Sequence, residues 1–233
     1  MPYYYYGFDW TYLVIVLPCL LLSMLASSSV NSTFNKYAKV NSIRRLTGAE
    51  AAQRVLSANG VRGVRIERVS GNLTDHFDPK TNVIRLSDSV YGSTSVAAIG
   101  VAAHEAGHAV QHATGYAPIK IRNSIVPIVN IGSQLAMPLF LIGLLINFLD
   151  LAYLGVFLFS FALIFQVVTL PVELNASSRA IKILDSSMLL YDDEIKPAKK
   201  VLRAAAMTYV AAVAATALQL LRLLLILNNR RRD

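Results

Sequence analysis

Charge and cysteine are both scarce in this sequence of 233 residues. Only 15% of the residues are charged, against roughly 25% in an average soluble domain, which excludes a disordered or low-complexity chain. The single cysteine, Cys19, has no partner within the chain, which excludes an intrachain disulfide scaffold. Basic residues outnumber acidic ones by 22 to 14, and the resulting charge of +8 leaves two explanations, a nucleic-acid partner or a membrane surface.

Four stretches of the sequence are uncharged and strongly apolar. A helix needs roughly 17–25 such residues to cross the hydrocarbon core of a bilayer. The alternative, buried core helices of a soluble protein, fits the last stretch best, because it is rich in alanine and is interrupted by Arg222. We expect transmembrane helices near residues 11–30, 125–148, 151–171 and 204–227.

The basic residues indicate on which side of the membrane each loop lies. Residues 31–123 hold 12 Lys and Arg and residues 171–203 hold 6, whereas the first ten residues and the turn at Asp150 hold none. The positive-inside rule therefore places both basic segments in the cytoplasm. A lipid bilayer explains the positive charge, and we expect no nucleic-acid partner.

The two ends of the chain are less regular. The first apolar stretch has no basic start, so we expect a retained anchor and not a cleaved signal peptide. The tyrosines at 3–6 and Trp10 are typical of an aromatic belt at the membrane interface. The arginines at 230–232 would lie outside the cell if the fourth helix crosses fully, so that helix either is an exception to the rule or is re-entrant or interfacial.

The segment 31–123 carries the local signals of a small α+β domain. Thr47 and Glu50 form a capping-box pattern at the start of a helix. Alternating residues at 64–69 and a short apolar run at 83–86 predict two strands, and the spacing at 96–114 predicts a longer helix. The predicted fold is thus an α-helical membrane protein of about four transmembrane helices with a small α+β domain at the cytoplasmic face.

The expected division of the chain follows the apolar runs and the basic loops. It comprises an N-terminal segment and anchor at 1–30, the α+β domain at 31–123, a transmembrane hairpin at 124–172, a cytoplasmic helical segment at 173–203, and a final membrane helix with a basic tail at 204–233.

The predicted helix at 96–114 contains the sequence His-Glu-Ala-Gly-His. His104 and His108 are four residues apart, so they lie on one helical face and can converge on one zinc ion. Glu105 is displaced around the helix, from where its carboxylate can take a proton from a water on the metal. The alternative is a buried helix with incidental histidines, for which the alanines and the small Gly107 would suit close packing.

A catalytic zinc site needs a third protein ligand. His112 lies eight residues after His104, about 12 Å along a helix axis, so a continuous helix cannot supply it and we expect it beside the site or on the surface. His76 is distant in sequence, and only a guess connects it with the site.

Glu173 is better placed to be the third ligand. The hairpin formed by the two middle transmembrane helices returns residue 173 to the side of the membrane that holds the histidines. A lone carboxylate at a membrane boundary needs a partner, which zinc would provide. An interfacial Glu173 paired with Arg122 or Arg179 is the alternative.

Three motifs stand out in the sequence: DHFDPKTNVIRLS at 75–87, AAIGVAAHEAGHAVQH at 97–112 and PVELNASSRA at 171–180. They resemble the YugP-like family of membrane zinc metallopeptidases, and this resemblance covers essentially the whole chain. The chain also shares the general plan of the integral-membrane gluzincins of the HtpX and CaaX-prenyl-protease type, through HEAGH and the segment around Glu173 only.

The resemblance implies a zincin-like catalytic domain, with one zinc ion per chain held by His104, His108 and Glu173, and with Glu105 as the base. Gluzincins often have an aspartate four residues after the ligand glutamate. Here that position is Ser177, which supplies no charge.

Other residues are candidates for supporting roles in the implied site. Asn175 could orient a ligand histidine in place of the missing aspartate. Arg179 could stabilise an oxyanion or reach a lipid phosphate, and His76 and Tyr91 are further oxyanion candidates. In zincins generally, the strand that precedes the zinc helix presents an edge to an extended peptide, so 83–86, paired near His76 and Phe77, is expected to have a free edge.

These observations predict a zinc-dependent integral-membrane endopeptidase of the bacterial cytoplasmic membrane, with its active site at the cytoplasmic face. Its substrate would be a membrane-associated or unfolded polypeptide, and family analogy suggests a role in membrane-protein quality control. Two alternatives remain, an intramembrane-cleaving zinc protease and a non-catalytic zinc-binding membrane scaffold. The sequence predicts no oligomeric state.

Overall fold

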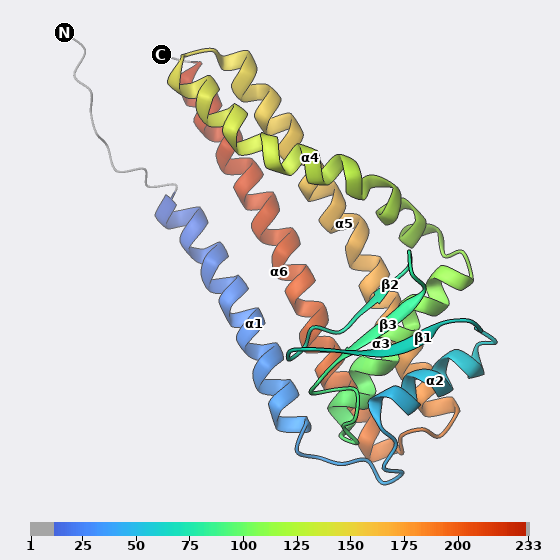
Figure 1. Cartoon of the computed structure of the whole chain (residues 1–233). Coiled ribbons are helices and arrows are strands. Elements are labelled where there is room, and N and C mark those ends of the chain that lie inside the picture. The colour runs from blue at the N-terminus through green and yellow to red at the C-terminus, as the bar shows by residue number, and fades with distance from the viewer. Residues whose placement is uncertain (1–11, 232–233) are drawn as a thin grey trace. The chain divides into compact units, whose positions relative to one another are not determined.

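The computed structural model describes residues 12–231 as a mainly helical chain with one small sheet (Figure 1). The tyrosines at 3–6 and Trp10, expected at the membrane interface, and Arg232 of the basic tail lie outside the described residues. In chain order the elements are a π-helical turn η1 (Tyr12–Val16), α1 (Leu17–Tyr37), α2 (Gly48–Ala58), β1 (Arg65–Val69), β2 (His76–Asp78), β3 (Val83–Ser87), α3 (Val96–Ala113), α4 (Ala117–Leu145), α5 (Leu149–Ser186) and α6 (Asp192–Arg230).

The described chain separates into two compact units, and α1, α4, α5 and α6 contribute residues to both. The apolar unit holds the described residues 12–25, 125–167 and 210–231. The mixed unit holds residues 26–124 and 168–209, and therefore the whole sheet and the helices α2 and α3.

Four of the described helical segments are long and apolar enough to cross a membrane: Tyr12–Tyr37, Ala117–Leu145, Leu149–Ser186 and Asp192–Arg230. This confirms the expected number of candidate spans. The helices extend well past the uncharged runs, however, and the 38 residues of α5 would measure about 57 Å, against about 30 Å for a hydrocarbon core. An uncharged run in the sequence indicates only the part of a helix that is suited to lipid. It does not indicate where the helix ends, because backbone hydrogen bonding continues through charged residues.

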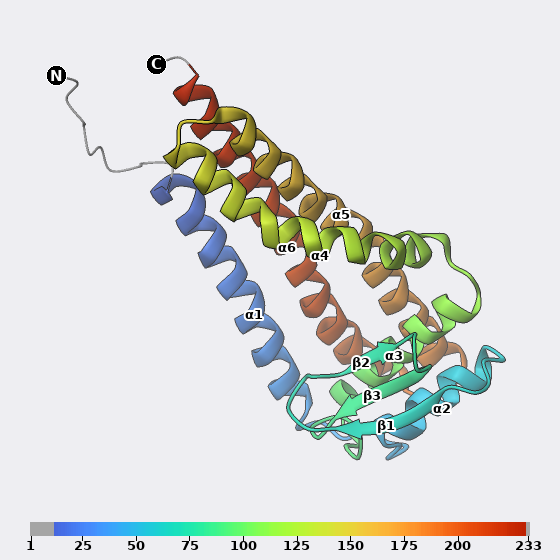
Figure 2. The same cartoon turned by 45° about the horizontal axis from the view of Figure 1, so that its top comes forward.

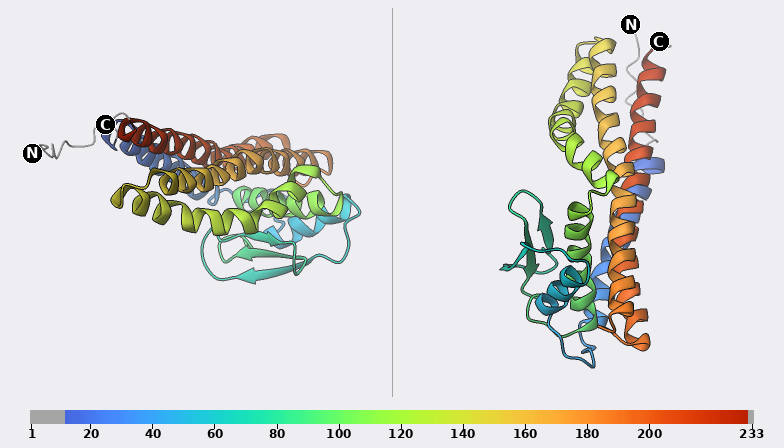
Figure 3. Two further views of the ribbon diagram at one scale, coloured as in Figure 1. Left: turned by 90° about the horizontal axis from the view of Figure 1, so that it is seen from above. Right: turned by 90° about the vertical axis from the view of Figure 1, so that its right-hand side faces the viewer.

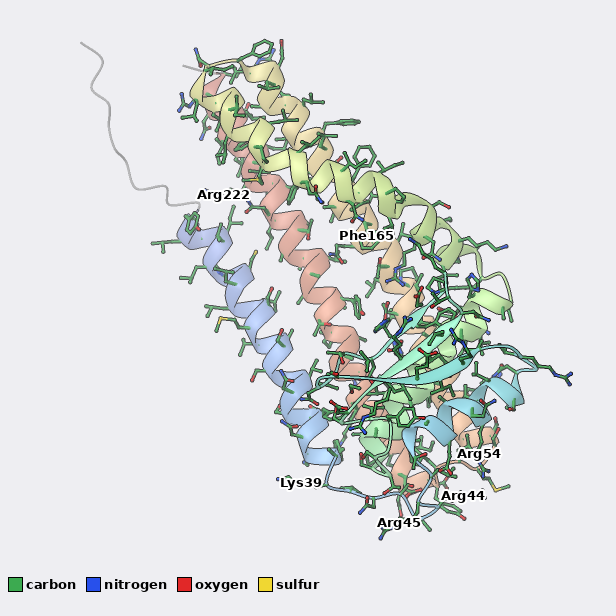
Figure 4. The ribbon with its side chains drawn as sticks, viewed as in Figure 1. Lys39, Arg44, Arg45, Arg54, Phe165 and Arg222 are labelled. Atoms are coloured by element: carbon green, nitrogen blue, oxygen red, sulfur yellow. The ribbon has the colours of Figure 1, made fainter. Side chains whose placement is uncertain are left out.

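In the apolar unit, Arg222 has an aromatic neighbour. Its guanidinium carbon lies 5.0 Å from the centre of the Tyr12 ring. A cation over an aromatic face is attracted by the ring electrons, which makes a charge within this long apolar helix less costly. Figure 4 labels Arg222 on α6.

The sheet of the mixed unit has the strand order β1-β3-β2 (Figure 2). β1 runs parallel to β3, and β2 runs antiparallel to it, with His76 opposite Arg85 and Phe77 opposite Ile84. The expected pairing near His76 and Phe77 is therefore confirmed. The expectation of a free edge at 83–86 is wrong, because β1 and β2 occupy both sides of β3.

Local sequence signals account for the ends of α2 and α3. The Thr47 side chain accepts a hydrogen bond from the Glu50 N–H, and the Glu50 carboxylate accepts one from the Thr47 N–H, which completes the predicted capping box. At α3 the Ser95 side chain accepts a single capping hydrogen bond from the Ala98 N–H. Gly115, just past the end of α3, has φ = 66°, a conformation that glycine adopts most readily.

Basic side chains gather at the connection between α1 and α2. Figure 4 labels Lys39, Arg44 and Arg45 in this connection and Arg54 on α2. All four belong to the mixed unit, and all four lie in the basic segment 31–123.

Helix α3 is the central element of the mixed unit. It lies between the sheet and the mixed-unit parts of α5 and α6 (Figure 3, right). Its small residues allow close contact, and a Cβ added at Gly107 would stand 2.8 Å from the Ala176 carbonyl oxygen of α5. Glycine at 107 therefore sets how near the α3 and α5 backbones approach each other.

Changing Gly107 to alanine should lower the melting temperature. Overpacking of this kind costs about 1–3 kcal/mol, more than the roughly 1 kcal/mol that alanine gains over glycine in a helix. Gly100→Ala is the matched control on the same helix, because its added methyl would meet the Ala198 Cβ at an ordinary 3.5 Å. Thermal unfolding in detergent should separate the two variants, and equal melting temperatures would contradict this packing.

Candidate metal centre

Two imidazoles of α3 face the same point. His104 and His108 come from successive turns of the helix, with ring centroids 4.6 Å apart and an edge-to-face arrangement. Their Nε2 atoms are 3.1 Å apart. The spacing read from the sequence thus places both rings on one face.

Glu173 of α5 completes a triangle with these two nitrogens. Its Oε2 lies 3.2 Å from His104 Nε2 and 3.4 Å from His108 Nε2. The other carboxylate oxygen, Oε1, lies 3.9 Å from an Arg122 guanidinium nitrogen. Glu173 is only 2% exposed, so its charge needs these partners. Among the described residues, these three side chains form the one cluster able to hold a metal ion.

The size of the triangle suits zinc. Tetrahedral zinc with bonds of about 2.0–2.1 Å holds its ligand atoms about 3.3 Å apart. The three observed separations are 3.1, 3.2 and 3.4 Å. Two imidazole nitrogens and one carboxylate oxygen are also a usual donor set for a catalytic zinc site.

Hydrogen bonds around Gln111 fix the tautomer of His108. The Gln111 Nε2 donates to the Val172 carbonyl at 2.8 Å and to Asn175 Oδ1 at 3.0 Å. Its Oε1 must therefore accept, and the donor is the His108 Nδ1–H at 3.0 Å. Because Nδ1 carries the hydrogen, the Nε2 of neutral His108 points a lone pair into the triangle.

Asn175 and Arg179 act through this same network. Arg179 Nε donates to Asn175 Oδ1 at 2.8 Å, which fixes the orientation of the Asn175 amide. The Arg179 guanidinium also lies over the Tyr116 ring, 5.8 Å from its centre. Both residues were expected near the site, and the structure connects them to His108 by way of Gln111.

Ser177 takes the corresponding position at His104. Its Oγ lies 3.1 Å from His104 Nδ1. When the hydroxyl accepts from an Nδ1–H, the Nε2 of His104 also presents a lone pair. Three electron-rich atoms then converge with no proton between them, and a cation is the partner that stabilises such an arrangement.

The electrostatic surroundings also favour a cation. Burial of the His108 imidazole lowers its pKa, but the hydrogen bond with Glu173 and the charges of Glu105 and Glu173 act in the opposite direction and prevail, so the net shift is upward. Neighbouring carboxylates thus favour positive charge at this point.

Glu105 lines a cavity of about 190 Å³ together with His104 and Glu173. Its side chain is largely buried, and among the described residues no hydrogen bond engages its carboxylate. Asp75 lines the same cavity, but its two oxygens accept hydrogen bonds from the N–H and the hydroxyl of Ser87. Burial raises the pKa of the Asp75 carboxyl, partly offset by those two hydrogen bonds.

Three sequence candidates neither line this cavity nor join the hydrogen bonds around Gln111. His112 packs its ring against Phe77, with centroids 5.8 Å apart. His76 is exposed, and its Nδ1 lies 2.9 Å from the Thr74 carbonyl oxygen. Tyr91 packs against the core of the mixed unit.

The structure adds residues that the sequence did not single out. Gln111 had a weak signal, since residues at i and i+3 on a helix are neighbours and it follows His108 by three. Tyr209 also lines the cavity, on α6, together with His104, Glu105 and Glu173. Tyr209 gave no signal, because it lies within an expected membrane run. Arg122 was named from the sequence as an alternative partner of Glu173, and one of its guanidinium nitrogens does lie 3.9 Å from Glu173 Oε1.

Residues 12–228 match the family described as "Putative neutral zinc metallopeptidase". The chain belongs to this family. A relative in Bacillus subtilis (strain 168), named "Putative membrane protease YugP", is 46% identical over 220 residues, which cover 94% of this chain and 98% of that protein. The YugP-like resemblance inferred from the motifs is thereby confirmed. No solved structure matches the chain.

Family membership and geometry agree on the metal. The family description names zinc, and the matched residues include the whole His104, His108 and Glu173 cluster. The donor set and its spacing fit that ion.

Changing Gln111 to leucine should weaken zinc binding about 10–100-fold, the usual effect of losing a partner that orients a ligand histidine. Leucine fills similar space but cannot hold the His108 Nδ1–H. Competition with a chromogenic chelator measures the affinity. Gln53→Leu, on the exposed face of α2, is the matched control and should bind zinc as the unchanged protein does. Unaltered zinc affinity in the Gln111 variant would contradict the tautomer assignment.

Proposed function

We propose that the protein is a zinc-dependent integral-membrane endopeptidase, with one zinc ion per chain held by His104, His108 and Glu173. The observation that carries this proposal is the ligand triangle together with a cavity that His104, Glu173 and the Glu105 carboxylate line. Three protein ligands leave a fourth position for water or substrate, as in catalytic sites, whereas structural sites are usually closed by four Cys or His ligands.

The chemistry divides between the metal and the side chains. Zinc in this site would polarise a peptide carbonyl and lower the pKa of a bound water toward about 7. Glu105 takes a proton from the attacking water, because its carboxylate is unengaged and faces the cavity. The same carboxyl group then gives that proton to the leaving amine. Gln111 and Ser177 keep the two histidines oriented throughout.

Tyr209 is the best-placed donor for the carbonyl oxygen of the substrate. Its phenol lines the same cavity as the zinc ligands His104 and Glu173 and the base Glu105. A hydroxyl in that position stabilises negative charge as it develops on the oxygen. Arg179, His76 and Tyr91 are less suited, since none of them lines the cavity.

The positive-inside rule supports a cytoplasmic active site. The mixed unit contains both segments that are rich in Lys and Arg, 31–123 and 171–203. We therefore place the protein in the bacterial cytoplasmic membrane, with a membrane-associated or unfolded polypeptide as its substrate. A part in membrane-protein quality control is the biological role that this location favours.

Replacing Glu105 by glutamine should abolish peptide cleavage and leave zinc bound. The amide keeps the shape of the side chain but cannot accept the proton, and loss of general acid–base catalysis costs about 10²–10⁴-fold. Mass spectrometry measures the zinc content. An assay with the membrane protein in nanodiscs and an unfolded protein as substrate measures cleavage. Cleavage at the original rate would remove Glu105 from the mechanism, and absence of cleavage by the unchanged zinc-loaded protein would favour a zinc-binding scaffold.

Changing Tyr209 to phenylalanine should lower kcat about 10²–10³-fold, the usual effect of removing one oxyanion donor, with little change in KM. Zinc content should stay at the original level, which separates the proposed role from a structural one. Tyr153→Phe, a tyrosine of α5 that does not line the cavity, serves as the control. An undiminished kcat in the Tyr209 variant would contradict this assignment.

A further inference from the structure

The cavity beside the zinc cluster has mostly apolar walls. Helix α3 contributes Val101, α1 contributes Phe34, and the first half of α6 contributes Leu202, Ala205 and Ala206. All of these residues belong to the mixed unit, as the zinc cluster does. None of the described residues that line the cavity is Lys or Arg.

The volume of the cavity fits one side chain and not a longer segment. It is about 190 Å³, below the roughly 300–1,000 Å³ of sites for drug-sized ligands. Apolar cavities of about 150 Å³ are known to admit benzene. A side chain between valine and phenylalanine in size therefore fits, and the tryptophan indole is at or beyond the limit.

Charge decides which side chains would enter. Asp75, Glu105 and Glu173 disfavour an acidic side chain by repulsion. A basic side chain would find no unengaged carboxylate outside the reaction centre, because both oxygens of Asp75 are already bonded to Ser87. An uncharged apolar side chain gains from burial at about 25 cal/mol per Å² and leaves no polar group unpaired.

We propose that this cavity is the specificity pocket of the enzyme, and that it takes an apolar side chain of up to phenylalanine size from a residue that flanks the cleaved bond. This inference rests on the proposed peptidase function. The assignment follows from shared residues, because His104, Glu105 and Glu173 line the cavity and also form the proposed reaction centre. The substrate class is thus apolar polypeptide, such as transmembrane segments or the exposed cores of unfolded proteins.

The first arm of the test measures cleavage by the zinc-loaded full-length protein in nanodiscs. Peptides that differ at one position are compared, and mass spectrometry locates the cut. With Leu or Phe beside the cut, kcat/KM should exceed that of Ser, Asp or Lys by about 10–200-fold, as is typical of a hydrophobic pocket. Equal cleavage of all these peptides would overturn the pocket and leave the peptidase function standing.

The second arm uses variants of α6. Ala205→Leu fills the cavity and should shift the preference from Leu and Phe to Ala by about tenfold or more. Ala204→Leu is the matched control. Ala204 does not line this cavity but lines a different pocket with Lys36 and Arg203, so the substitution should leave the preference unchanged. If Ala205→Leu loses zinc, the smaller Ala205→Val makes the same test. Identical preferences in the 204 and 205 variants would overturn the assignment.

The third arm separates this inference from the proposed function by measuring affinity instead of turnover. Fluorescence anisotropy follows the binding of labelled peptides to the Glu105→Gln protein. Leu and Phe peptides should bind at least tenfold more tightly than Ser or Asp peptides, and the preference should disappear with Ala205→Leu. Binding without that preference counts against the pocket. Selective binding together with a complete lack of cleavage by the unchanged protein counts against the peptidase.

Discussion

The convergence of His104 Nε2, His108 Nε2 and Glu173 Oε2 to within 3.1–3.4 Å depends on how closely α3 and α5 approach. Gly107 sets that distance, since a Cβ there would meet the Ala176 carbonyl oxygen at 2.8 Å. Residue 107 lies between the two histidines, and residue 176 lies one turn after the glutamate. On both helices, the residue that allows the close backbone approach is therefore a near neighbour in sequence of the proposed zinc ligands.

Local patterns predicted the local features well. The capping box at Thr47, the helix at 96–114 and the apolar runs all have counterparts in the structure, because each depends on interactions within a few residues. Partnerships between distant segments were harder to predict. The central position of β3 required a strand to insert between two earlier ones, and no spacing in the sequence indicates that. Tyr209 and Glu173 line one cavity from α6 and α5, but Tyr209 lies within an apolar run, and nothing in the sequence indicates that it approaches Glu173.

The same helices that are candidates for membrane spans also shape the cavity. Phe34 on α1 and Leu202 and Ala205 on α6 bring apolar walls to a centre whose chemistry is polar. A zinc site needs a few oriented donors, and the rest of its wall is free to select the substrate. On the specificity proposed above, residues that carry no catalytic signature would direct this protein to apolar polypeptides.

Anomalous scattering at the zinc absorption edge, recorded from crystals of the zinc-loaded protein, tests the central claim most directly. We predict one peak per chain, about 2.0–2.2 Å from Nε2 of His104, Nε2 of His108 and a carboxylate oxygen of Glu173. A peak bound by other residues, or a zinc ion that lacks Glu173 as a ligand, would contradict the proposed metal centre and the mechanism built on it.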